Sequence, residues 1–381
     1  MSIDTTQQIA SPTAGSGGSA GRGAGNGGGV RGRENVTGWL FLAPAIVILG
    51  LFLVLPIAMA AWVSVSDWSG TGSPFSSKVG FIGGENYAAL LAEPGLAQDN
   101  FGTSIRNNLY FVLFVVPLQT AAALLLAVVL HQRGLKGRNF FRTTYYFPTV
   151  TSSVAISVVF LFLFASTGTV NAALALFGLE GPSWFAEPRG IFHLVLNGLG
   201  LVDPAQPPAA LAEASVLGVS LFDWLAGPSV AMCSIILLVV WTSTGGFMLM
   251  FYASLQNIPV SVDEAAIVDG TTPWQRFWQV TLPQLRPTLF LVLTLGLIGT
   301  WQVFDQIYVL SKGAPANTTI TPAFLSYSTS FITKEWGQGS AIAFMLFFLI
   351  VVLTLVQRWV LRDRDVPNGR RARRLAAKGG R

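Results

Sequence analysis

The chain has 381 residues, of which 11% are charged and 52% hydrophobic, and its mean hydropathy is +0.57. A soluble domain carries about 25% charged residues, so this composition excludes a soluble enzyme, a secreted scaffold and a disordered protein. The single cysteine, Cys233, excludes an intramolecular disulfide and a cysteine-based metal cluster. The two histidines, His131 and His193, lie far apart in sequence, so neither a metal site nor a cofactor is expected.

The net charge of +5 comes from one end of the chain. Residues 362–381 contain eight Lys or Arg and two Asp, which gives this segment +6 and leaves −1 for the rest. A basic run beside an apolar segment is typical of a cytoplasmic flank on anionic lipid. The tail therefore predicts contact with membrane lipid and not with nucleic acid, or else a solvated tail that only sets orientation.

The apolar residues occur in long blocks. Residues 1–34 are rich in Gly, Ser, Ala and Thr and are predicted to be disordered. Six apolar runs follow, each long enough to cross a membrane as a helix. They are residues 39–65, 108–130, 144–164, 229–255, 288–311 and 341–361. The fold class is therefore predicted to be all-α, a polytopic membrane protein with six transmembrane helices in residues 35–361.

The loops between these runs alternate in basic residues. The 131–143 loop carries four Lys or Arg and no acid, whereas the 165–228 segment carries one Arg and five acids. The positive-inside rule then places both termini in the cytoplasm and the 165–228 segment outside. Within that segment the apolar patch 191–202 is too short to cross a bilayer, so we expect an interfacial or packing helix there.

The 256–287 loop is long for a connection and faces the cytoplasm in this topology. Ser261 and Glu264 have capping-box spacing, which predicts a short helix from Ser261, and Gly270 lies where a left-handed cap would end it. A second helix is predicted to begin after Thr272 and to end before the next Leu-Pro pair. Helices this short are marginal in water, so a partner protein, the membrane surface or the other helices must cover them.

The same loop resembles the EAA motif of ABC importer permeases. The residues at the motif's spacing are Glu264, Ala265, Ala266, Asp269, Gly270, Leu282 and Pro283. Residues 303–308 and 312–315 are similar to the binding-protein-dependent carbohydrate subgroup, of maltose and glycerol-phosphate type, and the similarity covers about 37–362. Two features depart from the family pattern: Thr271 replaces the usual Ala, and the 165–228 segment is longer than is typical.

In that family the loop forms a coupling helix that docks in a groove of a separate ATPase. The resemblance implies that Glu264, Ala265, Ala266, Asp269 and Gly270 carry this coupling. The chain has no Walker A sequence, so it is not expected to hydrolyse ATP. The implied partners are a second homologous permease, an ABC ATPase dimer, an extracytoplasmic solute-binding protein and a carbohydrate or related polyol. The implied location is the plasma membrane.

Polar groups inside apolar helices are costly unless they face a cavity or one another. Carboxylate and amide groups beside aromatic rings suit a polyhydroxylated solute, and sugar-contacting positions of the maltose-type permeases that the chain resembles fall on matching segments. The predicted pathway residues are Thr242, Ser243, Gln302, Asp305 and Tyr308. A regular fifth helix would place Trp301, Asp305 and Tyr308 on one face, and the 241–246 stretch predicts a loosened turn in the fourth. The alternative is that these groups only pack helices.

Three other functions remain open at this point. A stand-alone secondary transporter would show inverted repeats, and none is evident. An intramembrane enzyme would need a nucleophile and base, or paired carboxylates, at one depth, whereas the apolar runs offer Asp305 alone as a central acid. An ABC permease for a non-sugar solute would share the loop and differ around Asp305.

Overall fold

The computed structural model describes residues 30–360, apart from 133 and 205–206. Within these residues helices dominate, and the one sheet is a two-stranded hairpin. Residues 1–29 of the predicted disordered tail, and the predicted basic tail at 362–381, lie outside the described residues. The all-α class is therefore confirmed for the part of the chain that the structure describes.

The chain divides into two units, residues 1–57 and 58–381. α1 (Val30–Leu49) continues through the π-turn η1 (Gly50–Val54) into α2 (Leu55–Ser64), whose first three residues are the last of the first unit. Its large apolar side chains, such as Trp39 and Phe52, are exposed. The start at Val30 contradicts the predicted disorder over 30–34, because extending an existing helix costs much less than nucleating one.

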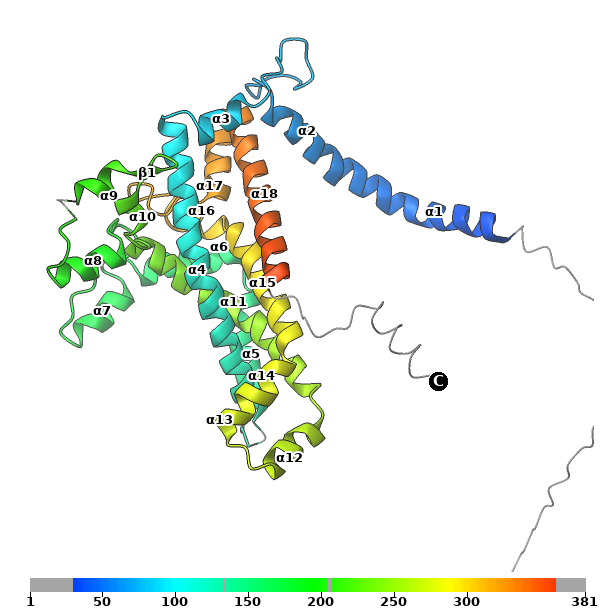
Figure 1. The fold of residues 1–381 in the computed structure, drawn as a ribbon, viewed down its shortest axis with the longest axis vertical. Helices are drawn as coiled ribbons and strands as arrows, with labels where there is room; N and C mark the ends of the chain where they lie inside the picture. The colour runs from blue at the N-terminus through cyan, green and yellow to red at the C-terminus, as the bar shows by residue number, and fades with distance from the viewer. Residues whose placement is uncertain (1–29, 133, 205–206, 361–381) are drawn as a thin grey trace, which may run out of the picture. The chain divides into compact units, whose positions relative to one another are not determined.

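The second unit is built around long helices that cross one another (Figure 1). Its helices outside the 165–228 segment and the 256–287 loop are α3 (Glu85–Leu91), α4 (Leu96–His131), α5 (Arg138–Val150), α6 (Ser153–Leu163), α11 (Val230–Gln256), α15 (Arg286–Trp301), α16 (Asp305–Leu310), α17 (Pro322–Tyr327) with the π-turn η3 (Ser328–Ile332), and α18 (Trp336–Val360). In the described chain, five helical stretches are long and apolar enough to span a membrane, and a sixth if the bent pair α5–α6 counts as one span.

The third predicted span, 144–164, is not a straight helix. α5 and α6 meet at an angle of 98°, and α5 already begins at Arg138, inside the stretch expected to be a basic loop. Pro148 lies in the last turn of α5. Proline in a helix interior removes a backbone hydrogen bond and displaces the preceding turn, which helps to explain why the chain bends here rather than continuing.

The fifth predicted span, 288–311, is also broken. α15 ends at Trp301 and α16 begins at Asp305. Gln302–Phe304 lie between the two helices and are not helical. The shared face predicted for Trp301, Asp305 and Tyr308 is therefore wrong, and Trp301 is buried against other side chains. The fourth span shows the reverse: α11 is continuous through 241–246, where the sequence predicted a loosened turn.

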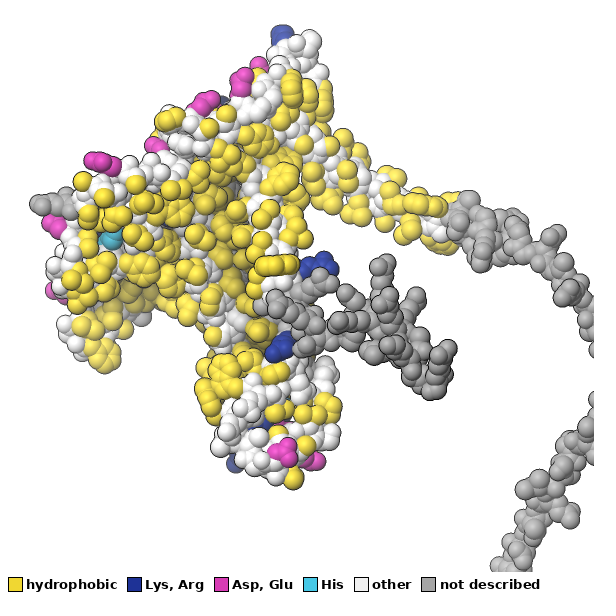
Figure 2. Space-filling view, viewed as in Figure 1, with side chains coloured by type: hydrophobic (Ala, Val, Ile, Leu, Met, Phe, Trp, Pro, Cys, Tyr) yellow, Lys and Arg dark blue, Asp and Glu magenta, His cyan; other side chains and the backbone are white. Residues whose placement is uncertain are grey.

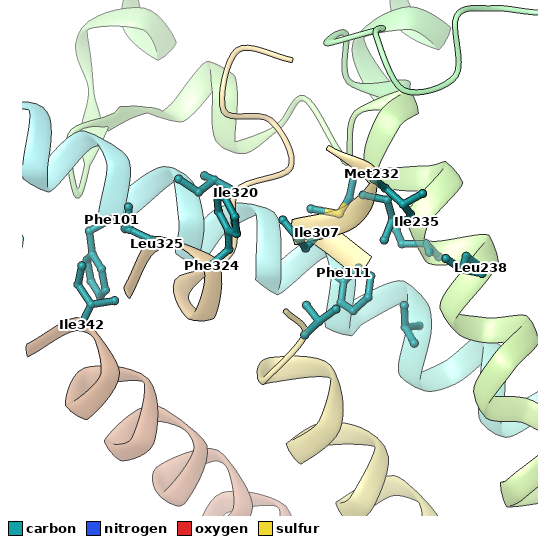
Figure 3. Packing of buried hydrophobic residues seen from close by; sticks show 14 of the residues in the cluster. Phe101, Phe111, Met232, Ile235, Leu238, Ile307, Ile320, Phe324, Leu325 and Ile342 are labelled. Atoms are coloured by element: carbon teal, nitrogen blue, oxygen red, sulfur yellow. The ribbon is translucent and has the colours of Figure 1, made fainter. Parts of the chain in front are cut away.

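The main core joins the N-terminal half of α4 to α11, α16 and α17. Figure 3 shows Phe111 of α4 close to Met232 and Ile235 of α11 and to Ile307 of α16. All four side chains are fully buried. Because apolar burial is worth roughly 25 cal/mol per Å², this cluster fixes α16 to the long helices even though α16 has only six residues.

The 165–228 segment forms a small layer of its own beside α4 and α11. It contains α7 (Thr169–Ala175), α8 (Ile191–Gly198), α9 (Ala209–Glu213), the hairpin β1 (Ser215–Val216) and β2 (Val219–Ser220), and α10 (Leu221–Trp224). α8 confirms the short helix predicted at 191–202. His193 of α8 packs on the Phe222 ring, with centroids 4.1 Å apart, and burial lowers the pKa of its imidazole.

Charge is distributed unevenly on the second unit. In Figure 2 hydrophobic side chains cover the middle of the visible face, while acidic side chains gather near α3 and the 165–228 segment and again at the opposite end, near α12 (Val260–Val268). Such an apolar band between polar ends is what a bilayer requires of the surface that it surrounds.

Candidate functional site

A cavity of about 400 Å³ lies where the broken α15–α16 span meets α4, α11 and the α5–α6 bend. Four of the five predicted pathway residues line it: Thr242, Ser243, Gln302 and Asp305. Tyr308 does not line the cavity, and its ring lies against Phe304, which does. The structure thus brings together polar groups from helices that are distant in sequence.

The break between α15 and α16 is held open by side chains from elsewhere. Asn108 Nδ2 of α4 donates to the Trp301 carbonyl oxygen at 3.2 Å, and Thr321 Oγ1 donates to the Val303 carbonyl oxygen at 3.1 Å. Carbonyl groups at a helix end need such partners. Asn108 and Thr321 are fully buried, so their hydrogen bonds hold the break in the packed interior. Gln302, within the break, is exposed at the cavity.

Asp305 lies in the first turn of α16 and is exposed. Ser153 Oγ, at the start of α6, donates to Asp305 Oδ2 at 2.5 Å. Hydrogen bonds to a carboxylate are short and strong, and a helix N-terminus favours negative charge. The bend between α5 and α6 thus positions the carboxylate at the cavity, a role for Ser153 that the sequence did not suggest.

Gln119 of α4 lines the same cavity and was missed in the sequence analysis. Its side chain is 1% exposed, and its Oε1 accepts a hydrogen bond from Ser243 Oγ of α11 at 2.6 Å. On the other side it lies against Gly296 of α15, where an added Cβ would be 2.5 Å from Nε2. Gln119 therefore joins three helices around the cavity. In the sequence, Gln119 could have been found as a single amide side chain within an apolar run, where a polar group is costly unless it has a partner.

α5 and α11 approach closely at the cavity wall. Thr149 Oγ1 donates to the Thr242 carbonyl oxygen at 2.7 Å and accepts from the Gly246 amide at 3.1 Å. At Gly245 an added Cβ would overlap the Tyr145 carbonyl oxygen. Small residues at such crossings let two backbones pack in contact. The Ser243 hydroxyl therefore joins α11 to α4, while Thr242 contacts α5 through its backbone oxygen and its hydroxyl bonds to Val239 within α11.

The 256–287 loop forms α12, then α13 (Pro273–Arg276), the π-turn η2 (Phe277–Thr281) and α14 (Leu282–Gln284). The predicted capping box at Ser261 does not form, because the helix starts one residue earlier, at Val260 after Pro259, without a side-chain cap. The second capping box is confirmed, with Thr272 and Gln275 bonded reciprocally. The second helix does not end before Leu282, since the π-turn carries it into α14.

The glycine cap of α12 is confirmed in detail. Gly270 has φ +76°, its amide bonds to the Ile267 carbonyl oxygen at 3.0 Å, and the Thr271 amide bonds to that of Ala266 at 3.1 Å. These are the two bonds of a Schellman motif. Thr271, which departs from the family pattern, adds its hydroxyl as a second donor to the Ala266 carbonyl oxygen at 2.6 Å. The departure therefore reinforces the cap.

The five predicted coupling residues divide between two environments. Glu264, Ala265, Asp269 and Gly270 are exposed, whereas Ala266 is buried on the inner side of α12. An ion pair of 3.3 Å between Arg276 Nε and Asp263 Oδ1 links α13 to α12. Half-exposed pairs of this kind contribute about 0–1 kcal/mol, so the glycine cap and packing matter more to the loop's shape.

The outer surface of the loop is unusually apolar. Val268 is 85% exposed and Trp274 is 70% exposed, and Trp278 lies in edge contact with Trp274, with ring centroids 5.5 Å apart. Beneath the loop, a cavity of about 550 Å³ separates α12 and α13 from the ends of α4 and α11. Exposed aromatic side chains on a loop that projects from a protein are typical of a contact surface for another molecule.

Comparisons with known proteins agree with this architecture. The chain is 30% identical to the lactose transport system permease protein LacF of Rhizobium radiobacter over 87% of this chain and 95% of that protein. It is 28% identical to the trehalose/maltose transport system permease protein MalF of Thermococcus litoralis, over 87% and 96%. Its fold resembles a chain in the crystal structure of a bacterial ABC transporter involved in the import of alginate, with a TM-score of 0.65, 20% identity, and coverage of 88% and 98%.

Residues 119–366 match the family described as the binding-protein-dependent transport system inner membrane component. The matched range includes Gln119, the α5–α6 bend, the cavity residues on α11 and α15, and the whole 256–287 loop. Since this is well over half of the chain, and the relatives align over most of their own length, the chain belongs to the inner membrane components of binding-protein-dependent transport systems.

Proposed function

We propose that the chain is the permease subunit of an ABC importer that carries a carbohydrate or a related polyol. One observation carries this proposal: the same two helices, α11 and α15, line the cavity and bear the projecting 256–287 loop. A rigid displacement of the loop would therefore move two walls of the cavity. Relatives named for lactose and for trehalose and maltose support a sugar as the solute.

The loop is the proposed docking site for a separate ATPase. Its exposed Glu264, Ala265, Asp269 and Gly270 lie beside the apolar surface around Val268 and Trp274, whose exposed aromatic side chains are typical of a protein contact. Buried Ala266 is assigned to packing that holds the loop's shape. A two-fold ATPase offers two such contacts, so a second homologous permease completes the assembly.

The cavity is the proposed solute pathway. Exposed Gln302 and Asp305 provide an amide and a carboxylate that can bond to hydroxyl groups, and Phe304 provides a ring face for the C–H side of a sugar. Thr242 and Ser243 complete the wall, and Tyr308 lies just beyond it. In this arrangement residues 35–361 form the permease domain, with both termini and the loop in the cytoplasm and the 165–228 segment outside, facing the solute-binding protein.

The test is ATP-dependent sugar uptake by the complete transporter in proteoliposomes, with and without the solute-binding protein. Uptake that needs ATP, the ATPase and the binding protein supports the proposal. Uptake by the purified chain alone, driven by an ion gradient, would instead identify a secondary transporter. ATP-dependent uptake of amino acids or peptides, with no uptake of sugar, would support an ABC importer and contradict a carbohydrate as its solute.

Asp305 provides the sharpest single-residue prediction at the cavity. Asp305→Ala removes a hydrogen-bonded carboxylate, and bonds to charged groups contribute about 1.5–3 kcal/mol, so the apparent KM for the sugar should rise roughly 10- to 100-fold. Asp305→Asn keeps an acceptor for Ser153 and should lose less. The exposed acid Glu93 provides a control, because Glu93→Ala should leave KM unchanged. Equal KM values in all variants, at normal ATPase docking, would exclude Asp305 from the pathway.

A further inference from the structure

Four aromatic rings continue outward from the cavity in unbroken contact. Phe304 stacks on Tyr308 with centroids 5.6 Å apart, Tyr308 meets Tyr327 at 5.5 Å, and Tyr327 stacks on Phe331 at 5.2 Å. Phe304 also contacts Tyr327 directly, at 5.2 Å. We call these four residues the aromatic track. They come from the helix break, α16, α17 and η3, so two separate chain segments build one surface.

The inner end of the track is the cavity itself, because Phe304 lines it. At the other end Phe331 makes an edge contact of 4.7 Å with Trp336, whose ring in turn lies 5.5 Å from Trp68. Gly70 allows the loop after Trp68 to press on Trp336, since any Cβ there would overlap the indole. The track therefore runs between the cavity and the membrane-spanning bundle's end near the 66–82 loop.

Two rings of the track, Phe304 and Tyr327, are half-buried against the main core, and the other two are exposed. Phe331 is 57% exposed and Tyr308 is 40% exposed, whereas Phe324 behind them is buried and packs against Phe304 and Tyr327. The buried Phe324 and the contacts among the rings hold the exposed parts of Tyr308 and Phe331 in place. Exposed aromatic groups that are rigidly supported are expected where a ligand or partner makes contact.

Charged groups occur beside the rings. Asp305 lies at the inner end of α16, and Lys312 Nζ lies 6.0 Å from the Tyr308 ring centroid, just past the other end of that helix. A surface that meets only lipid would exclude both charges. Ring faces flanked by a carboxylate and an ammonium group match a chain of sugars, whose C–H faces stack on rings while hydroxyl groups bond to the charges.

We propose that the aromatic track binds an oligosaccharide, with one sugar ring in the cavity and the following rings stacked along Tyr308, Tyr327 and Phe331. This rests on the proposed carbohydrate transport and adds the length of the solute. The track gives the chain a surface that is tolerant of sugar identity, because stacking uses the ring face, while Gln302 and Asp305 bond to the hydroxyl groups of the ring in the cavity. Successive contacts 5–6 Å apart also let a chain advance in small steps.

The test compares solute lengths in proteoliposomes holding the complete transporter. The probes are glucose oligomers and arabinose oligomers of one to five rings, and the variants are Tyr327→Leu and Phe331→Leu, which keep an apolar side chain and remove the flat ring. The matched control is Phe348→Leu, an exposed ring on α18 outside the track. Uptake of four- and five-ring oligomers by the two track variants should fall about tenfold, the equivalent of one or two lost ring contacts.

Each outcome separates the track from the proposed function. Retained uptake of one- and two-ring sugars by the variants, with intact subunit composition, supports the track. Wild-type transport confined to single rings, or variants that carry long oligomers as well as wild type, overturns the track and leaves carbohydrate transport standing. If the variants lose the second permease subunit on purification, the four rings form a protein interface and the sugar-binding track is overturned. No uptake of any probe by the wild type contradicts the proposed carbohydrate function itself.

Discussion

Gly245→Ala, at the contact of α11 with α5 next to the cavity, is expected to reduce transport more than the addition of a methyl group to a glycine that lines the cavity. An added Cβ at Gly245 of α11 would overlap the Tyr145 carbonyl oxygen of α5, and a backbone atom cannot rotate away as a side chain can. Overpacking of this kind costs about 1–3 kcal/mol. Moving α5 outward would also strain the bonds of Thr149 to Thr242 and Gly246, which fix the wall next to the α5–α6 bend.

The measurement is sugar uptake together with the thermal stability of the purified transporter. We expect uptake to fall at least tenfold and the melting temperature to fall with it. Gly299→Ala on α15 is the control, because Gly299 lines the cavity and has nothing within 4 Å of an added Cβ. Alanine is the better helix former by about 1 kcal/mol, so that control should be neutral or slightly stabilising. Equal behaviour of the two variants would contradict the close approach of α5 to α11.

The membrane-spanning helices could be predicted from sequence because their signal is local. Long apolar runs and short-range caps depend on neighbouring residues. Five predicted spans therefore appear as helical stretches near their predicted positions, one of them with the break between α15 and α16. The Thr272 capping box and the Gly270 cap form as expected. The capping box at Ser261 failed for a local reason as well. Pro259 starts the helix at Val260, which makes Ser261 an interior residue of the first turn.

The breaks could not be predicted, because their causes are distant in sequence. The end of α15 at Trp301 depends on Asn108 and Thr321, and the position of Asp305 depends on Ser153. The hydropathy of the sequence is that of a continuous apolar run both at the α15–α16 break and at the α5–α6 bend. A break in a membrane helix is tolerated only where other groups satisfy its backbone, and those groups are known only once the helices are packed.

The same limit applies to the candidate site. Sequence reasoning selected Gln302 and Asp305 by their polarity, and the structure places both at the cavity. It missed Gln119, whose importance lies in its contacts with Ser243 on one side and Gly296 on the other. A polar residue in an apolar run is visible in sequence, but which helices it joins is a property of the packed bundle.

Gly270→Val is expected to uncouple ATP hydrolysis from transport. Gly270 has φ +76°, a conformation that costs a residue with a Cβ about 1–2 kcal/mol and a β-branched residue more. Nothing lies within 4 Å of an added Cβ, so the effect acts through the backbone alone. Losing the left-handed residue breaks the Schellman bonds from Gly270 and Thr271 and changes the angle between α12 and α13. The chain should still insert, because its long apolar helices are untouched.

Gly270→Asn provides the matched control, because asparagine tolerates the left-handed region and adds a side chain of similar bulk. The measurement is sugar uptake per ATP hydrolysed in the assembled transporter. We expect Gly270→Val to lose at least tenfold in this ratio. Gly270→Asn should retain most of it. Similar loss in both variants would mean that the surface at residue 270 matters more than its backbone conformation. Normal coupling in both would remove the glycine cap from the coupling role and leave α12 to contact the ATPase without it.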